Sequence, residues 1–118
     1  MLNYEEMSDF EINMRVACSI DGVRVDENGN PEYAIDCFLH SDNGISVKWL
    51  RCGNDEFEFF NPCNNPSDAM PILTENKIGF KWVNGSCTAS SVLRGYHEST
   101  SDKPLRAAMI VFLMMPHK

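Results

Sequence analysis

The strongest constraint on the fold of this chain is an apolar segment near the end of the sequence. Residues 107–115 are nine consecutive apolar side chains, inside a predicted helix over residues 104–115. A helix that is apolar on every face must be enclosed by protein or by lipid, and crossing a membrane takes about 20 apolar residues. The segment is too short to cross one, so the sequence predicts a helix that is buried in a protein core.

The residues around this helix predict its ends and one ion pair. Asp102 is the predicted N-cap, Pro104 stands in the first turn where it loses no hydrogen bond, and Pro116 ends the helix. Arg106 is the one charged residue of the helix, and a cation in the first turn opposes the helix dipole. We therefore expect a nearby acid, and favour Asp68 because Asp102 is assigned to the cap. The alternatives are a pair with Asp102 itself and a solvated Arg106.

The size and composition of the chain predict one domain. The 118 residues are 43% hydrophobic and 23% charged, which is typical of a folded domain with a packed core, so we expect a single domain over residues 1–118. The number of cysteines is odd and their spacing fits neither a disulfide framework nor a zinc site, so reduced thiols and a cytoplasmic location are expected. These cysteines are Cys18, Cys37, Cys52, Cys63 and Cys87. The N-terminal residues do not resemble a signal peptide.

The charge of the chain is concentrated in its first third. The formal net charge is −7, and residues 1–42 hold ten acidic residues against two arginines. Such a surface repels phosphate backbones, so no direct nucleic-acid binding is expected. The simpler interpretation is a solvated face that aids solubility; the alternative is an acidic surface that imitates DNA for a basic partner.

Capping and alternation patterns predict the remaining elements. Ser8 and Glu11 form a capping box that begins a helix over residues 9–19. Period-two alternation predicts an antiparallel meander followed by a hairpin, and residues 94–101 are predicted to be a loop. The strands are expected at residues 33–40, 45–50, 56–60, 77–83 and 86–93.

The second hairpin has a distinctive pattern on each strand. Asn84-Gly85 favours a type I′ turn. Ile78, Phe80 and Trp82 are expected to point into the core, and the returning strand carries small residues on one face, which leave room for a close-packed helix. These small residues are Cys87, Ala89 and Ser91.

An asparagine- and proline-rich loop over residues 61–68 precedes a predicted short helix over residues 69–76. With Asp68 as the cap, Pro71 falls at the third helical position, where a proline is tolerated. A cap at Asn65 would place Pro71 inside the helix at a cost of about 3 kcal/mol, so Asp68 is preferred.

Catalytic and metal-binding interpretations are weak. Cys63 precedes a helix start, which lowers a thiol pKa, and His40 or His97 is a conceivable base, yet no nucleophile motif surrounds the cysteine. No two of the cysteines and histidines have the short spacing of a zinc site. Strand aromatics are interpreted as core rather than as a base-stacking platform, because few basic residues are interleaved with them. The sequence therefore predicts no catalytic residue, no metal and no cofactor.

Three stretches carry a family resemblance. SDFEINMRVA at residues 8–17, FNPCNNPSDAMPILTENKI at 60–78 and DKPLRAAMIVFLMM at 102–115 resemble the NinX family of the lambdoid-phage nin region. The resemblance implies a small cytoplasmic phage or prophage protein, and it brings no known activity or cofactor.

The expected fold is α+β, with an antiparallel sheet of about five strands packed against the buried C-terminal helix and two further short helices. The expected function is non-enzymatic binding of a host or phage protein, without membrane association. Polar loops on a rigid scaffold often carry function, so residues 61–68 are the predicted site. The predicted binding residues are Asn61, Cys63, Asn64, Asn65, Asp68 and Arg106. The alternatives are a small enzyme or ligand-binding protein with this loop as its pocket rim, and the DNA-mimic inhibitor.

Overall fold

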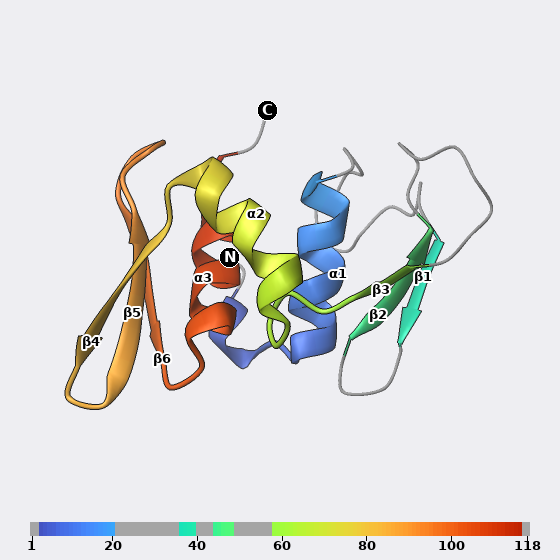
Figure 1. Cartoon of the computed structure of the whole chain (residues 1–118), viewed down its shortest axis with the longest axis horizontal. Helices are drawn as coiled ribbons and strands as arrows, with labels where there is room; N and C mark the ends of the chain where they lie inside the picture. Colours follow the sequence, from blue (N-terminus) through green and yellow to red (C-terminus); the bar gives the residue numbers. More distant parts are fainter. Residues whose placement is uncertain (1–2, 21–35, 40–43, 49–57, 117–118) are drawn as a thin grey trace. The chain divides into compact units, whose positions relative to one another are not determined.

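The computed structural model describes residues 3–20, 36–39, 44–48 and 58–116 (Figure 1). The chain divides into two compact units, residues 1–61 and residues 62–118. Each unit has its own helix or helices and its own sheet. The single domain that we expect over residues 1–118 stays a prediction.

The first unit begins with a short 3-10 helix, η1 (Tyr4–Glu6), and the helix α1 (Asp9–Ile20). The Ser8 hydroxyl accepts a hydrogen bond from the Glu11 backbone N–H at 3.1 Å, which confirms the predicted cap. Residues 12–17 are all buried. The sequence pattern had indicated only one packed face, and it missed the buried polar side chains of Asn13 and Arg15.

Three short strands form the sheet of the first unit: β1 (Asp36–Leu39), β2 (Ile45–Lys48) and β3 (Glu58–Phe60). They pair antiparallel in the order β1-β2-β3, which confirms the predicted meander, and α1 packs against β2. The outer ends of the predicted strands lie outside the described residues. A Cβ on Gly44 would come within 2.5 Å of the Phe59 ring, so this position has no room for a side chain.

The second unit contains α2 (Pro66–Asn76), β4 (Gly79–Val83), β5 (Ser86–Ser91), β6 (His97–Ser101) and α3 (Pro104–Met114). Its strands are antiparallel in the order β4-β5-β6. The expected single sheet of about five strands is therefore wrong: the described residues form two separate three-stranded sheets. Alternation identifies a strand but does not say which strands pair with one another.

The strand β6 occupies residues that were predicted to be a loop. Its sequence, HESTS, has no apolar residue and so gives no alternation signal. In the structure Ser99 pairs with Ala89 of β5 and is buried. Small polar residues form this strand because β5 supplies the backbone partners and α3 covers one face.

The helix α3 is buried over most of the predicted apolar run, although Leu113 is half-buried and Met114 is exposed. Residues 107–112 and Met115 are buried, and α3 packs against β5, β6 and α2 (Figure 1). The small side chains of Cys87, Ala89 and Ser91 are buried as well, in agreement with the prediction that they admit a close-packed helix. In the described part of the chain, no helix combines the length and the apolar character that crossing a membrane requires.

The predicted cap of α3 is wrong. The N-cap residue is Lys103, which makes no side-chain capping hydrogen bond, and its carbonyl accepts from the Ala107 N–H at 3.0 Å. Asp102 lies one residue too early, because the helix begins at Pro104. The Ser101 hydroxyl instead accepts from the Lys103 N–H at 3.1 Å and so holds the turn that leads into α3.

The edge strand β4 is the clearest departure from the expected core. Phe80 pairs with Ala89 and Trp82 with Cys87, so both aromatic side chains lie on the face of the sheet that carries α3. Yet Phe80 is 42% exposed and Trp82 62% exposed, and only the preceding Ile78 is buried. The reason is position: α3 lies mainly over β5 and β6, and β4 extends beyond that cover.

The turn between β4 and β5 has the predicted geometry. Asn84 has φ 50° and Gly85 has φ 81°, both in the left-handed region that a type I′ turn requires. The sequence therefore identified this hairpin and its turn correctly.

Candidate functional site

The predicted binding loop begins with a residue that serves the interior of the first unit. Asn61 is 3% exposed, and its side-chain oxygen accepts a hydrogen bond from the Asn13 amide at 2.8 Å. A buried amide without a partner costs about 1–3 kcal/mol, so this pair supports the fold. Sequence reasoning missed the pair, because nothing in the pattern links two asparagines that are 48 positions apart.

The remainder of the loop belongs to the second unit, and only part of it faces solvent. Pro62 and Cys63 are buried, whereas Asn64 is exposed. Among the described residues, Cys63 and Cys87 are buried and not in a disulfide, and no group of three or more histidine, cysteine and acidic side chains is placed to hold a metal ion. Cys52 and His40 lie outside the described residues. The first three residues of the loop are therefore buried, and Asn64 is one of its exposed residues.

The helix α2 starts three residues earlier than predicted. Asn65 is the N-cap, and its side-chain oxygen accepts from the Ser67 N–H at 3.0 Å. Asp68 is therefore not the cap but the third helical residue. A carboxylate at this position stabilises the helix, because it interacts favourably with the positive end of the helix dipole. The early start lets Pro66 occupy the first helical position, which suits proline, although it leaves Pro71 inside the helix.

The corrected cap leads to a stability prediction. Asn65→Ala should lower the free energy of unfolding by about 1 kcal/mol, because the Ser67 N–H loses its acceptor. Asn64→Ala, at the exposed neighbouring position, should change it by no more than about 0.5 kcal/mol. Urea denaturation followed by circular dichroism measures both. A larger loss from Asn64→Ala than from Asn65→Ala would contradict the assignment.

Arg106, the last predicted binding residue, is the third residue of α3 and is half-buried, as is Asp68 on α2. Its acidic partner stays a prediction. Asp68 is preferred in the sequence analysis because Asp102 is expected to cap α3. In the structure Asp102 is not the cap, so this argument for Asp68 no longer holds. Asp68 and Asp102 both stay candidates for this ion pair.

A hydrogen-bonded network at the end of α2 positions the hairpin beside it. The side chain of Asn76 donates to the Ile72 carbonyl at 2.9 Å and accepts from Arg94 at 3.2 Å. The backbone carbonyl of Asn76 accepts from the Ser91 hydroxyl at 2.8 Å. Lys77 then takes a left-handed conformation with φ 56°, which ends the helix and turns the chain into β4. The network ties both ends of the β4–β5 hairpin to α2.

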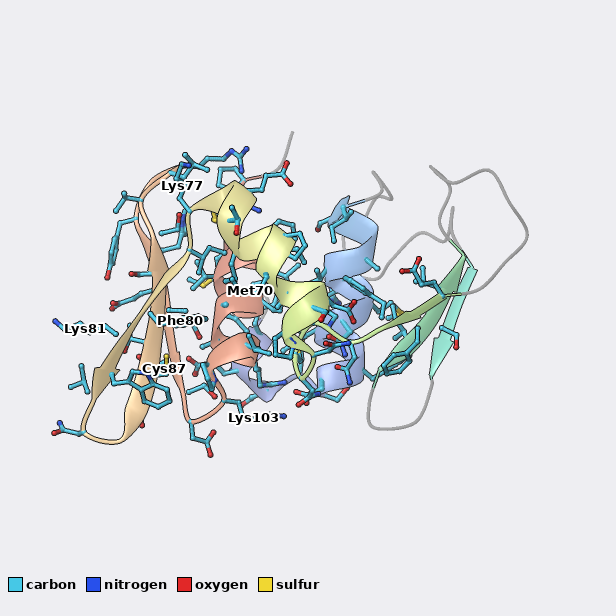
Figure 2. All side chains as sticks on the ribbon, in the orientation of Figure 1. Met70, Lys77, Phe80, Lys81, Cys87 and Lys103 are labelled. Carbon is cyan, nitrogen blue, oxygen red and sulfur yellow. The ribbon has the colours of Figure 1, made fainter. Side chains whose placement is uncertain are left out.

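The strand β4 carries exposed apolar side chains. We define the β4 edge surface as Phe80, Lys81, Trp82 and Val83. All its residues are exposed. Figure 2 shows Lys81 pointing away from the sheet and Phe80 on the side of α3. Sequence reasoning assigned Phe80 and Trp82 to the core, because their alternation with Lys81 is the pattern of a strand with one buried face.

The connection between β5 and β6 adds further exposed apolar side chains, from Val92, Leu93 and Tyr96. The Tyr96 hydroxyl donates to the Glu98 carboxylate at 2.6 Å, and this hydrogen bond raises the pKa of Tyr96 above its usual value. On the sheet face away from α3, the hydroxyls of Thr88 and Thr100 hydrogen-bond at 2.8 Å. This threonine pair is polar, whereas the exposed aromatic residues of β4 lie on the opposite face, on the α3 side.

The charge around β4 differs from that of the rest of the chain. Residues 76–97 contain no aspartate or glutamate and carry Lys77, Lys81 and Arg94. The whole second unit holds six basic and four acidic residues, against thirteen acidic and four basic residues in the first. The β4 edge surface is thus an apolar and mildly basic region in an acidic protein.

The chain matches the family model described as Bacteriophage P22, NinX, over residues 3–116. This protein belongs to the NinX family. The match runs across residues 20–59, which lie outside the three stretches that carried the resemblance, so those stretches underestimated its extent. No curated protein and no solved structure matches the chain.

Membership of the NinX family makes this a phage accessory protein. The NinX-like stretches contain the loop over residues 61–68, α2 and α3, whereas β4 begins just after the second stretch ends at Ile78. The candidate surface on β4 therefore comes from the structure alone.

Proposed function

We propose that this NinX protein is a non-enzymatic accessory protein that binds another protein of the host or phage in the bacterial cytoplasm, through the β4 edge surface. The observation that supports the proposal is the exposure of Phe80 and Trp82 on neighbouring positions of one strand face. Exposed apolar patches mark interaction sites, and tryptophan is enriched among the residues that dominate binding energy.

The predicted loop supports such a role less well. Asn61 and Cys63 are buried and Asn65 caps α2, so these residues stabilise the protein rather than face a partner. Asn64 is an exposed residue of this loop. It provides a direct comparison with Trp82.

Affinity capture from phage-infected host cells, compared across variants, tests the proposal. Wild-type protein and Met70→Ala should capture the same partner in equal amounts, because Met70 is an exposed apolar residue of α2 outside the β4 edge surface. Trp82→Ala should capture much less of it while its circular dichroism spectrum is unchanged. Amine cross-linking should join the partner to Lys81.

Two results would contradict the proposed site. If Asn64→Ala abolishes capture and Trp82→Ala does not, the partner binds the loop over residues 61–68. If no variant changes the captured proteins, the β4 edge surface is not a binding site.

A further inference from the structure

We propose that β4 binds its partner by strand addition, and that the added strand is an extended acidic peptide segment of the partner protein. The inference rests on the proposed function and specifies how the β4 edge surface would be used. In this mode main-chain hydrogen bonds give affinity, and alternate side chains of the peptide give specificity.

The hairpin geometry determines which backbone groups of β4 face outward. The tight Asn84-Gly85 turn joins Val83 and Ser86 as a hydrogen-bonded pair, and hydrogen-bonded and non-hydrogen-bonded pairs alternate along an antiparallel ladder. Lys81 and Gly79 then point their backbone groups at β5. Phe80 and Trp82 point theirs away from it, toward the edge of β4 that has no paired strand among the described residues.

The same residues also supply the side chains that would contact an added strand. Phe80 and Trp82 lie on the α3 side of the sheet, and Lys81 lies on the opposite side. Side chains of a strand alternate between faces. An added strand would therefore place apolar side chains beside the two aromatics and other side chains beside Lys81.

The positive charge around β4 favours a partner segment that carries acidic side chains. No acidic residue occurs between Glu75 and Glu98, so Lys81 has no acid on β4 or on the neighbouring β5. An acidic side chain of the peptide on the Lys81 side would form a favourable opposite-charge cross-strand pair with Lys81.

Lys81 also argues against a second copy of this chain as the occupant. Lys81 is the middle residue of β4, so a symmetric antiparallel pairing over the full length of two β4 strands would place the two lysines directly opposite each other. Like charges in that position are destabilising, and lysine on an edge strand is a common means of preventing self-association. The other edge of the sheet, β6, has a fully polar sequence and offers no apolar contact.

A synthetic peptide tests the chemistry directly. The probe is a fluorescent peptide of about seven residues, extended in character, with a phenylalanine between glutamates. Titrated against the full chain, it should bind with an affinity that Lys81→Glu lowers by about tenfold and that a peptide with lysines in place of the glutamates restores. Backbone amide signals of Phe80 and Trp82 should become protected from hydrogen exchange in the complex.

Two substitutions at Trp82 distinguish the contribution of the backbone N–H to peptide binding from the contribution of the side chain. Trp82→Ala removes the indole and keeps the outward N–H, whereas Trp82→Pro removes both without breaking a bond to β5. Trp82→Pro should therefore bind the peptide several-fold more weakly than Trp82→Ala, while both variants keep the circular dichroism spectrum of the wild type. A peptide with N-methyl groups on the amides that face β4 should not bind, and this arm needs no variant protein.

The outcomes distinguish this inference from the proposed function. If the N-methylated peptide binds as well as the unmodified one, or if neither binds, strand addition of an acidic segment is wrong. A capture experiment that still depends on Trp82 would then leave the proposed function in place. Dimerisation of the chain in analytical ultracentrifugation that Trp82→Pro abolishes would identify a second copy as the occupant and overturn the inference.

Discussion

Met109→Ala is expected to lower the free energy of unfolding by about 2–5 kcal/mol. Met109 is 0% exposed at the centre of α3, where every neighbour from Ala107 to Phe112 is buried too. Truncation removes apolar contacts and leaves a cavity, because the small residues of β5 opposite the helix cannot expand to fill it. Urea denaturation of wild type and variant, followed by circular dichroism, measures the change.

Met114→Ala is the matched control for this prediction. It is the same substitution in the same helix, at a side chain that is 40% exposed. Its effect should be clearly smaller, about 1 kcal/mol, because 40% of the Met114 surface is already in contact with water and truncation at the surface leaves no enclosed cavity. Equal losses from the two substitutions would show that α3 is not buried as the structure describes.

Pro71→Ala is expected to raise the free energy of unfolding by about 2 kcal/mol. Pro71 is the sixth residue of α2 and is exposed, so its removal costs little packing. Inside a helix, proline is about 3 kcal/mol less favourable than alanine, because it has no N–H and its ring clashes with the preceding turn. The greater freedom of the unfolded alanine variant subtracts about 0.4–1 kcal/mol from that gain.

Pro66→Ala is the control for the position of the proline. Pro66 is the first residue of α2, where its missing N–H has no helical acceptor. This substitution should give no gain, and a loss of up to about 1 kcal/mol through the unfolded state. If Pro71→Ala gives no gain in stability either, the helix begins near Asp68, as the capping pattern of the sequence indicates.

Local signals in the sequence predicted the features that depend on neighbouring residues. The capping box at Ser8, the type I′ turn at Asn84-Gly85 and the apolar run of α3 each determine their structure within a few positions of the chain. The small residues of β5 predicted a close-packed helix for the same reason, since their pattern is confined to one strand. The family, too, was readable from short stretches of sequence.

The environment of the side chains in the predicted binding loop was not readable from the sequence, because it depends on residues that are distant in the chain. The loop over residues 61–68 was expected to bind a partner, yet the Asn61 side chain is occupied by Asn13 and that of Asn65 by the start of α2. The sequence alone does not show whether a loop asparagine faces a partner protein or forms hydrogen bonds within its own chain. Only the distance to its acceptor or donor separates the two roles.

The sequence by itself determined where most of the helices and strands occur and which helix must be buried. The tertiary structure decided how the strands divide into two sheets, that the polar residues of β6 form a strand, and that β4 is an edge. Alternation gives Phe80 and Trp82 the same face as Ala89 and Cys87, but burial depends on whether a helix extends over that face. Because α3 lies over β5 and β6, two aromatics with a core-like pattern remain exposed at the edge of the sheet.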